Sequence, residues 1–445
     1  MPVTVLADAL TQARLVGLVI DPTHPDYDRG RAVYNAVIER RPGAIVQVAD
    51  PSDVQAVVRI AAETGLPLAV RCGGHSFAGL STCDDGIVCD LSRLGRVDVD
   101  PVRRTVDVGG GALLGDVDRA GEPYGLVTPA GVVSHTGVGG LTLGGGMGYL
   151  SRRFGLTIDS LIEVDLVTAD GRLSRVDAMV DPELFWGLRG GGGNFGIVTR
   201  FRFRMHDLGP VLIGRWTHPA SATREVLARY LDAIAETPRT LTSAFDVTRD
   251  GIEVRAVWTG STQGAEAGVA RFDFPGGVAE PDGTASFVEL QRAADDALPW
   301  GRRYYSKGGF LAELDQRVID VIVDAVAGSP LPELEVYCLQ LGGAVGDVGD
   351  DATAYAGRAA AFYWIAQGAW DDPADDDRAI DWCRATARRL GDLSMSTNYV
   401  NEQADTGIAQ SAYGDTTYRR LGRLKGRYDP ANVFRLNQNI TPIRP

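Results

Sequence analysis

The sequence is poor in cysteine and histidine and has no long apolar run. Its 445 residues include five histidines and five cysteines, and the cysteines are Cys72, Cys83, Cys89, Cys338 and Cys383. They form neither a CxxC pair nor an even, closely spaced framework, so we expect neither a zinc site nor a disulfide scaffold. Reduced thiols are typical of the cytoplasm, and we predict a cytoplasmic protein without a bound metal ion.

Targeting signals and an excess of basic residues are also missing. Residues 1–20 have no basic leading region, and Asp8 and Arg14 interrupt the apolar stretch, so neither a signal peptide nor a membrane anchor is expected. The chain has 44 Lys and Arg against 58 Asp and Glu, a formal net charge of −14. Because nucleic acid and anionic membranes repel such a chain, we expect neither as a partner. Nothing in the sequence indicates an oligomeric state.

The length exceeds what one hydrophobic core usually serves, so at least two domains are expected. In the first half, short β-rich runs alternate with glycine turns, and Asp50 precedes a helix with a periodic apolar face. From residue 211 to 395 the runs are longer and alternate with long helical stretches, which indicates a sheet with helices on one face. We predict strands at residues 44–48, 87–91, 105–108, 161–168, 197–204, 241–247, 252–258, 335–341 and 360–370, and helices at 182–188, 221–236, 311–326, 375–390 and 417–425.

The most informative segment is residues 71–81, RCGGHSFAGLS, which follows the apolar run at 66–70. Gly73 and Gly74 have no Cβ, so the backbone can approach a flat or phosphorylated ligand, with His75 as the one nucleophilic group. Taken alone, such a GGH is more often a turn with a surface histidine. A second glycine segment at 137–148, GVGGLTLGGGMG, also permits backbone N–H groups to contact pyrophosphate or an aromatic ring.

Two common nucleotide sites do not fit these glycines. Residues 191–196, GGGNFG, satisfy GxGxxG, but they follow a predicted helix and precede a predicted strand, the reverse of the order in a dinucleotide-binding βαβ unit. The sequence contains no GxxxxGK[ST] either, which excludes a P-loop.

Six segments together resemble the FAD-linked oxidases of the vanillyl-alcohol oxidase superfamily, in particular the berberine-bridge-enzyme-like branch. They occur in the family's order at residues 71–76, 137–156, 184–196, 299–301, 398–401 and 428–440. The resemblance implies an α+β fold with a two-part FAD-binding domain of the PCMH type. Its first part would be residues 1–210, with a core at about 38–208, and its second part 396–445. A substrate domain of antiparallel sheet covered by helices would be inserted at 211–395.

The resemblance also implies how FAD is held. His75 would be bonded to the 8α carbon of the flavin. Many relatives make a second bond through a cysteine where this chain has Val133, so we predict a single covalent link. Thr136, preceded by His135, stands where oxygen reaches the flavin, and its hydroxyl could bond flavin N5 or an oxygen species. The other cofactor-binding residues that the resemblance implies are Arg71, Gly73, Gly74, Ser76, Gly79, Gly139, Gly140, Gly144, Asn194, Gly196, Ile197, Val198, Tyr399 and Asn437.

The implied reaction is oxidation of an alcohol or amine C–H by hydride transfer to flavin N5, with O2 as acceptor, in small-molecule (secondary) metabolism. Tyr399 matches the position of the base, with Tyr149 as its candidate partner, although both could equally be packing residues. A phenol with a pKa near ~10 needs a lowered pKa for that role. Strand alternation places Tyr363 and Gln367 on one face as substrate residues, and Gln340 is a weaker candidate on the neighbouring strand.

Three alternatives remain. Thr136 and His135 also suit an oxygenating enzyme that forms a flavin–oxygen adduct. A carbohydrate oxidase of the same branch is less favoured, because the sugar-oxidising relatives typically carry the double attachment. A flavin-binding protein without turnover is disfavoured by the presence of both His75 and Tyr399.

Overall fold

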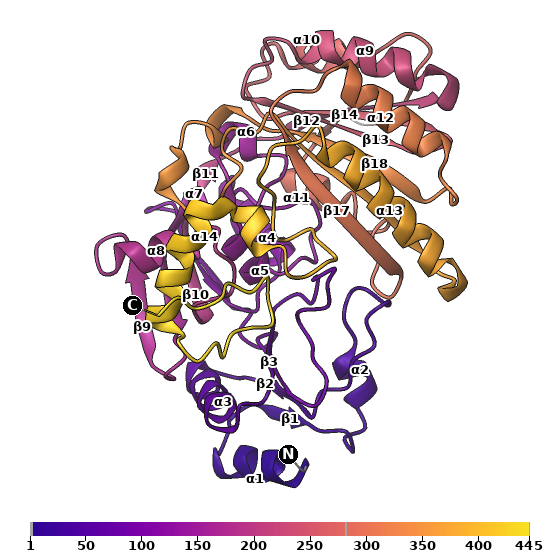
Figure 1. Ribbon diagram of the computed structural model, residues 1–445. Helices are drawn as coiled ribbons and strands as arrows, with labels where there is room; N and C mark the ends of the chain where they lie inside the picture. The colour runs from indigo at the N-terminus through magenta and orange to yellow at the C-terminus, as the bar shows by residue number, and fades with distance from the viewer. Residues whose placement is uncertain (1–2, 281–282, 445) are drawn as a thin grey trace.

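The computed structural model describes residues 3–280 and 283–444, so the parts of our predictions that fall on Met1, Pro2 and Pro445 lie outside the described residues. Three large sheets and the helices packed on them build the molecule (Figure 1). The predicted α+β class is confirmed. None of the helices in the described ranges combines the length and the apolar character that crossing a membrane requires.

The first sheet delivers the histidine segment to the middle of the molecule. Its strand order is β1-β2-β4-β3, with β2, β4 and β3 parallel. Helix α3 packs on it, and the Asp50 side chain caps this helix by accepting from the N–H groups of Ser52 and Asp53. Residues 71–81 leave the end of β3. The bounds are β1 Leu18–Ile20, β2 Ala44–Gln47, β3 Leu68–Arg71, β4 Ile87–Asp90, α1 Val3–Gln12, α2 Tyr27–Arg31 and α3 Pro51–Thr64.

The second sheet is antiparallel and has the order β5-β6-β10-β8-β9. The glycine-rich segment 191–196 lies between helix α8 and strand β10, which is the helix-then-strand order that the sequence indicated. The bounds are β5 Val97–Asp100, β6 Thr105–Gly109, β8 Leu161–Val167, β9 Leu173–Asp177, β10 Ile197–Arg204, α4 Leu114–Gly121, α5 Val138–Gly144, α6 Ser151–Phe154, α7 Thr157–Ser160 and α8 Pro182–Leu188, with a small ribbon of β7 Leu126–Val127 and β11 His206–Asp207.

The third sheet is antiparallel in the order β15-β12-β14-β13-β18-β19-β17, and β16 pairs with β12. Its bounds are β12 Val211–Pro219, β13 Leu241–Val247, β14 Gly251–Trp258, β15 Val278–Ala279, β16 Thr284–Ala285, β17 Arg303–Leu311, β18 Leu334–Gln340 and β19 Phe362–Trp370. Our prediction omitted β12, β17 and the short strands β15 and β16, and it started the helix of 311–326 too early. Leu311 ends β17, where it pairs with Phe362, and the helix starts after its cap, Asp315.

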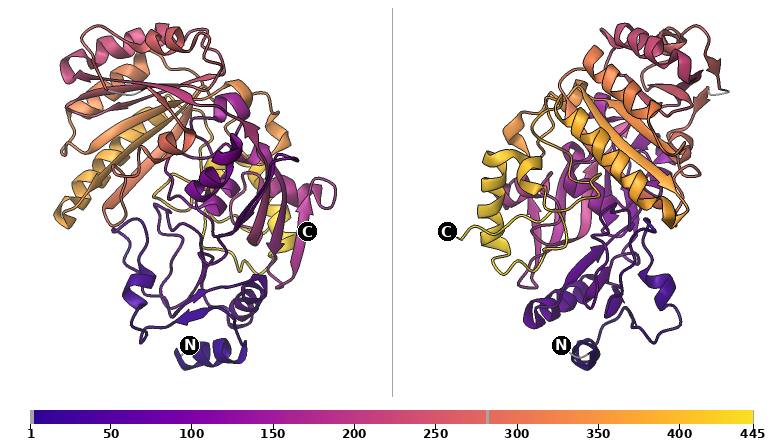
Figure 2. Two further views of the ribbon diagram at one scale, coloured as in Figure 1. Left: turned by 180° about the vertical axis from the view of Figure 1, so that it is seen from behind. Right: turned by 45° about the vertical axis from the view of Figure 1, so that its right-hand side comes forward.

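The two faces of this sheet differ, and the difference positions the site. Phe362, Trp364 and Ala366 of β19 join a core with helices α9 (Thr223–Ile234), α12 (Gln316–Ala327) and α13 (Asp376–Gly391), which cover the outer face in Figures 1 and 2. Tyr363 and Ile365 belong to a different core, which includes Tyr399. The inner face therefore looks toward the first half of the chain. Two short helices, α10 Ala265–Val269 and α11 Phe287–Arg292, complete this region.

The C-terminal segment returns to the second sheet. Helix α14 (Ala409–Tyr428) is kinked at Gly414 and shares a core with α8 and β10. Lys425 is completely buried, and its ammonium group donates to Asp429 Oδ2 at 2.6 Å and to the backbone oxygen of Asn194 at 2.8 Å. Figure 1 shows this segment in yellow beside the second sheet. We propose the domain boundaries accordingly: 1–210 with 396–445, and 211–395 inserted between them.

Candidate active site

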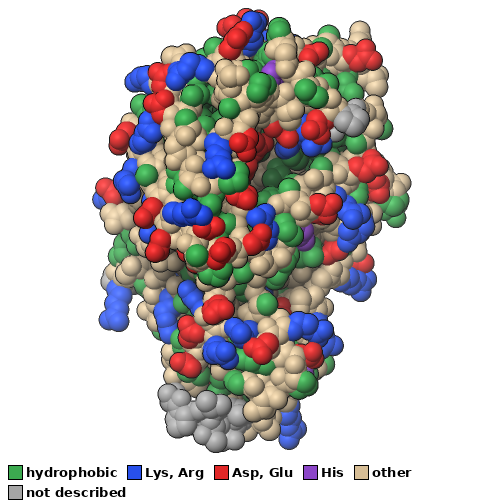
Figure 3. Space-filling model, turned by 90° about the vertical axis from the view of Figure 1, so that its right-hand side faces the viewer, with side chains coloured by type: hydrophobic (Ala, Val, Ile, Leu, Met, Phe, Trp, Pro, Cys, Tyr) green, Lys and Arg blue, Asp and Glu red, His purple; other side chains and the backbone are tan. Residues whose placement is uncertain are grey.

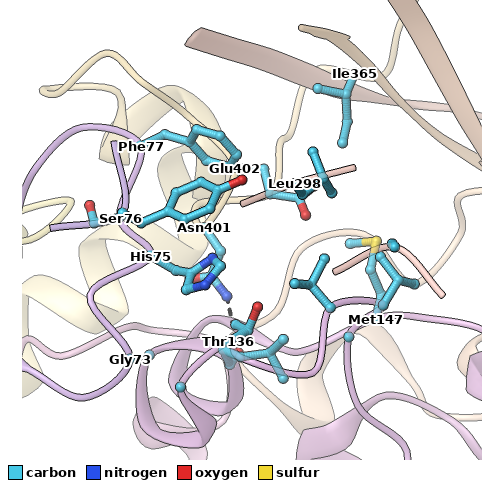
Figure 4. Close-up of a pocket in the computed structure, with 18 of the residues that line it drawn as sticks. Gly73, His75, Ser76, Phe77, Thr136, Met147, Leu298, Ile365, Asn401 and Glu402 are labelled. Atoms are coloured by element: carbon cyan, nitrogen blue, oxygen red, sulfur yellow. Dashed lines mark hydrogen bonds between the residues drawn. The ribbon is translucent and has the colours of Figure 1, made fainter. Parts of the chain in front are cut away.

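A cavity of about 1050 Å³ lies between the glycine segments of the first half and the inner face of the third sheet. Its lining joins residues from both halves of the chain and from the C-terminal segment. In Figure 4, Ile365 and Leu298 point into it from one side, and Thr136 and Met147 lie opposite them. Small-molecule pockets usually have about 300–1,000 Å³, so this cavity has the capacity for a large ligand.

His75 lies in the wall of this cavity and is held on two sides. Its ring stacks on Tyr34 with centroids 4.1 Å apart, and its Nε2 lies 2.6 Å from His135 Nδ1. His135 Nε2 in turn lies 4.0 Å from a carboxylate oxygen of Asp295. Burial, with a smaller effect of His135, lowers the pKa of His75 to about 3. The imidazole is therefore neutral at physiological pH, and its Nδ1 is the nitrogen that does not face His135.

The glycines shape a cradle that has room for a ligand. A Cβ on Gly73 would lie 2.3 Å from the backbone nitrogen of Gly137, so the two segments touch at these residues. A Cβ on Gly140 or Gly193 would meet no atom within 4 Å, and both positions line the cavity. Side chains there would fill space that a cofactor needs.

Unsatisfied polar atoms mark the far end of the cradle. Asn437 Oδ1 and Gln438 Oε1 are buried without a hydrogen-bond partner among the described residues, and both side chains line the cavity. Buried acceptors of this kind require donors, which the amino and hydroxyl groups of a nucleotide provide. The unpaired acceptors at this end and the glycine cradle together fit a dinucleotide such as FAD.

Most predicted site residues lie in the cavity lining. These are Gly73, Gly74, His75, Ser76, Thr136, Gly139, Gly140, Tyr149, Asn194, Gly196, Ile197, Val198, Gln367, Tyr399 and Asn437. Six others are not lining residues: Arg71, Gly79, His135, Gly144, Gln340 and Tyr363. His135 still contacts His75 directly.

The other five residues outside the lining have structural surroundings of their own. Arg71 is buried and forms an ion pair with Asp90 at 2.8 Å. Gly79 and Gly144 are packed against Ile38 and Asn401, respectively. The Gln340 amide bonds Ser243 and Thr237, which removes it from substrate contact. Tyr363 lies on the inner face as predicted but packs against Tyr399, with ring centroids 5.6 Å apart.

Tyr399 and Tyr149 do not form the expected pair. The Tyr399 hydroxyl oxygen accepts from Asn401 Nδ2 at 2.9 Å and from the N–H of Gly146 at 3.2 Å, whereas Tyr149 accepts from Arg255 at 3.1 Å. Burial raises the pKa of Tyr399 above its ordinary value, although the hydrogen bonds from Asn401 and Gly146 act in the opposite direction. The lowered pKa that a tyrosine base requires is therefore not found.

Glu402 is a lining residue that the sequence reasoning missed. Burial raises the pKa of its carboxyl to about 7, while the neighbouring Tyr363 hydroxyl acts in the opposite direction. Figure 4 shows it in the wall beside Asn401, near Leu298. Its position directly after the NYVN segment was the signal that could have identified it, because that segment leads the chain into the cavity.

One of the five cysteines also reaches the cavity. Cys72 lines the cavity beside Gly73, and so does Val133. The Cys72 thiol donates to the backbone oxygen of Ala112 at 3.4 Å, and burial raises its pKa to about 11. It is therefore held as a neutral thiol, which is a poor nucleophile. The four other cysteines are buried.

Comparisons with known proteins agree with this site. The family described as FAD binding domain matches residues 42–177, and the family described as berberine and berberine like matches 397–441. An FAD-linked oxidoreductase of Dictyostelium discoideum is 33% identical over 92% of this chain and 91% of its own. The solved structure of 6-hydroxy-D-nicotine oxidase from Arthrobacter nicotinovorans has a TM-score of 0.87 and 27% identity, covering 97% of this chain and 99% of that one.

A third similarity concerns the fold alone. Glucooligosaccharide oxidase from Acremonium strictum, whose structure is described as containing a 6-S-cysteinyl, 8α-N1-histidyl FAD, has a TM-score of 0.88 at 22% identity and covers 99% of this chain and 100% of that one.

A two-part domain places two glycine segments and a neutral histidine around one large cavity. This arrangement defines an FAD-linked oxidoreductase of the PCMH type. The chain belongs to the berberine-bridge-enzyme-like family of FAD-linked oxidoreductases. The resemblance predicted from six short segments is thus confirmed, as are FAD as cofactor and the oxidoreductase class.

Proposed function

We propose that this oxidase carries its FAD on a single bond to His75 and oxidises an alcohol or amine C–H of a small molecule, with O2 as the electron acceptor, in secondary metabolism. Bound FAD supplies the hydride acceptor and passes the electrons to O2. The observation that carries the proposal is the state of His75. A neutral imidazole in the cavity wall, with Nε2 facing His135 and Nδ1 left for the cofactor, is a nucleophile ready for attachment.

The single link follows from the neighbouring side chains. Val133 cannot form a thioether, and Cys72 is held as a neutral thiol by its bond to Ala112. A relative in which two links are described shares only the fold with this chain. A single link would also favour an alcohol or amine over a carbohydrate as substrate, because the relative with two described links is a glucooligosaccharide oxidase.

Three side chains serve the proposed reaction, and one of them accepts the proton that leaves when a hydroxyl or amine carbon is oxidised. Tyr399 accepts two hydrogen bonds and has a raised pKa, so it stays protonated and its O–H is available to donate to a ligand in the cavity that it lines. Glu402, with a pKa of about 7, is the group that can accept a proton at neutral pH. Thr136 presents its hydroxyl from the opposite wall (Figure 4), where it is available to an oxygen species.

The attachment is tested by precipitating the purified holoenzyme with acid and recording the flavin absorbance of pellet and supernatant. We expect yellow colour in the wild-type pellet and in the His24→Ala control, and its release in His75→Ala. His24 is a suitable control because it lies outside the cavity lining. Colour released from all three proteins would overturn the covalent link, and two modified sites in the peptide mass spectrum would overturn the single one.

The electron acceptor is tested by mixing reduced enzyme with O2 in a stopped-flow instrument. We expect reoxidation much faster than that of free flavin, with one H2O2 released per substrate oxidised. Reoxidation no faster than free flavin would indicate a dehydrogenase instead. Less than one H2O2 per turnover, with oxygen found in the product, would indicate the oxygenating reaction.

A further inference from the structure

The inner face of the third sheet forms one wall of the cavity and carries three carboxylates on three neighbouring strands. Asp246 comes from β13, Glu253 from β14 and Glu335 from β18, and all three line the cavity. Among the described lining residues of these three strands, Arg255 is the only cation, and Arg215 lines the cavity from the adjacent strand β12. This wall therefore has an excess of negative charge.

The strand register brings like charges together. Asp246 stands directly opposite Glu253 and, on its other side, opposite Tyr337, while Glu335 stands opposite Gln367. Like charges directly opposite one another destabilise a sheet, so packing of the sheet alone does not favour this arrangement. Alternation along the strands turns the apolar residues to the helices and leaves these carboxylates to the cavity.

Two arginines of the sheet line this wall, Arg215 on β12 and Arg255 on β14, and the three carboxylates outnumber them. Arg255 bonds Glu253 and the Tyr149 hydroxyl, and the Gln367 amide donates to Glu335 at 2.8 Å. Within the described residues, no ion pair joins a cation to Asp246 or Glu335. Burial, and then the charge of Glu335, raises the pKa of Asp246 well above its usual range, while Arg255 acts in the opposite direction. Burial likewise raises the pKa of Glu335.

A polar atom without a partner lies on the same wall. The Tyr337 hydroxyl is buried, lines the cavity and has no hydrogen-bond partner in the part of the chain that the structure describes. Around the whole cavity, seven acidic side chains line the wall against three arginines. The space-filling view in Figure 3 shows a hollow on this side of the molecule with acidic side chains at its edge. A positively charged group that donates hydrogen bonds would satisfy both the carboxylates and this hydroxyl.

We propose that the substrate is a cationic amine whose ammonium group binds between Asp246 and Glu335, within reach of the Tyr337 hydroxyl. The rest of the molecule extends toward His75 on the opposite side of the cavity. This inference rests on the proposed oxidase function, because it assigns the substrate class of the same cavity. The excess of carboxylates selects against anionic substrates, since an acid would face an unpaired like charge.

The experiment is isothermal titration calorimetry of the holoenzyme, under anaerobic conditions, with three probes of similar size: benzylammonium, benzyl alcohol and phenylacetate. We expect the ammonium ion to bind at least about tenfold tighter than the alcohol, and the carboxylate to bind weakest, because a hydrogen bond or ion pair with a charged group is worth this much in a buried site. Equal affinity for the ammonium ion and the alcohol, or no binding of the ammonium ion, overturns the proposal.

Variants locate the site. The double variant Asp246→Asn with Glu335→Gln keeps the shape of both side chains and should lose the preference for the ammonium ion. The matched control, Asp377→Asn with Glu266→Gln, removes two exposed charges outside the cavity lining and should retain it. An unchanged preference in the first variant overturns the assignment. If that variant loses its flavin, the three-probe comparison on the wild type decides.

The two proposals fail in different ways. Covalent flavin that reacts with O2, combined with no preference for the ammonium ion, leaves the oxidase function standing and removes the cationic substrate. If the ammonium ion is clearly preferred but no alcohol or amine reduces the flavin, the cation site stands and the oxidase function is overturned.

Discussion

At the scale of single residues, the site is controlled by what burial does to charge. The same low-polarity surroundings lower the pKa of His75 and raise the pKa of Tyr399 and Glu402. Each shift favours the neutral form, and each suits a different task. The neutral histidine can become a bond to the cofactor, the neutral phenol can donate a hydrogen bond, and the carboxyl can exchange a proton near pH 7.

Glu402→Gln is the residue-scale prediction. Because the pKa of Glu402 is raised to about 7, the carboxylate needed to accept a proton is lost as the pH falls below 7. In the wild type we therefore expect kcat/KM to fall tenfold per pH unit on the acid side. The variant should lose about 10²–10⁴-fold in rate and should lose this limb of the profile.

The measurement is steady-state kinetics between pH 5 and 9 with a substrate that does not itself titrate in this range. Glu266→Gln, an exposed residue outside the cavity lining, serves as the control and should behave as the wild type. If Glu402→Gln kept both its rate and its acid limb, the proton would go elsewhere.

At the scale of elements, the sequence predicted those pieces whose own pattern determines them. Strands β6, β8 and β10 of the second sheet and helix α3, with its Asp50 cap, were correct because alternation, periodicity and a capping side chain are local signals, whereas the edge strands β5 and β9 were missed. Strand β17 was missed because its two glycines, Gly308 and Gly309, weaken the strand pattern, and its pairing with β19 comes from a distant part of the chain. Glu402 was missed for a related reason, since burial by other segments produces its pKa.

Helix α14 provides the prediction at this scale. Replacing Lys425 by Met leaves the buried Asp429 carboxylate without its cation and the backbone oxygens of Asn194 and Phe434 without a donor. Removing one partner of a buried pair costs about 3–5 kcal/mol of stability. We expect urea unfolding to shift to lower concentration by a corresponding amount, with faster release of any flavin that is not covalently held.

The control for this change lies on the same helix. Arg423 is exposed, so Arg423→Met should leave the unfolding midpoint almost unchanged. A small effect of Lys425→Met, comparable to that of Arg423→Met, would mean that the buried pair contributes little to holding the C-terminal segment.

At the scale of the whole molecule, contacts between the third sheet and the rest of the chain must fix the distance of this sheet from the glycine segments that line the cavity. Arg152 of α6 contributes to this, because its buried guanidinium donates to the backbone oxygens of Leu241 and Leu341 at the ends of two strands of the third sheet. Burial lowers the pKa of this arginine, a cost that its carbonyl contacts offset. The cavity lies between the two units, so this contact also sets its shape.

We predict that Arg152→Leu weakens the contact between helix α6 and the third sheet. Buried carbonyls without a donor cost about 1–3 kcal/mol each, so thermal unfolding should begin at lower temperature and the KM should rise more than kcat falls. Scanning calorimetry and steady-state kinetics on the same samples provide the test. The exposed Arg172, replaced by Leu, is the control. Unchanged KM together with unchanged unfolding would show that other contacts fix the position of the third sheet.

The return of the chain to its first domain has a consequence for synthesis on the ribosome. Asn437 and Gln438, which line the cavity, are translated only after the whole inserted segment. At about 5–20 residues per second, the first unit waits roughly 10–40 s while the inserted segment is made. During that interval the apolar surface that will receive α14 is uncovered. Newly made chains should therefore need chaperones until α14 has been made, and the cavity is complete for flavin only after Asn437 and Gln438 have emerged.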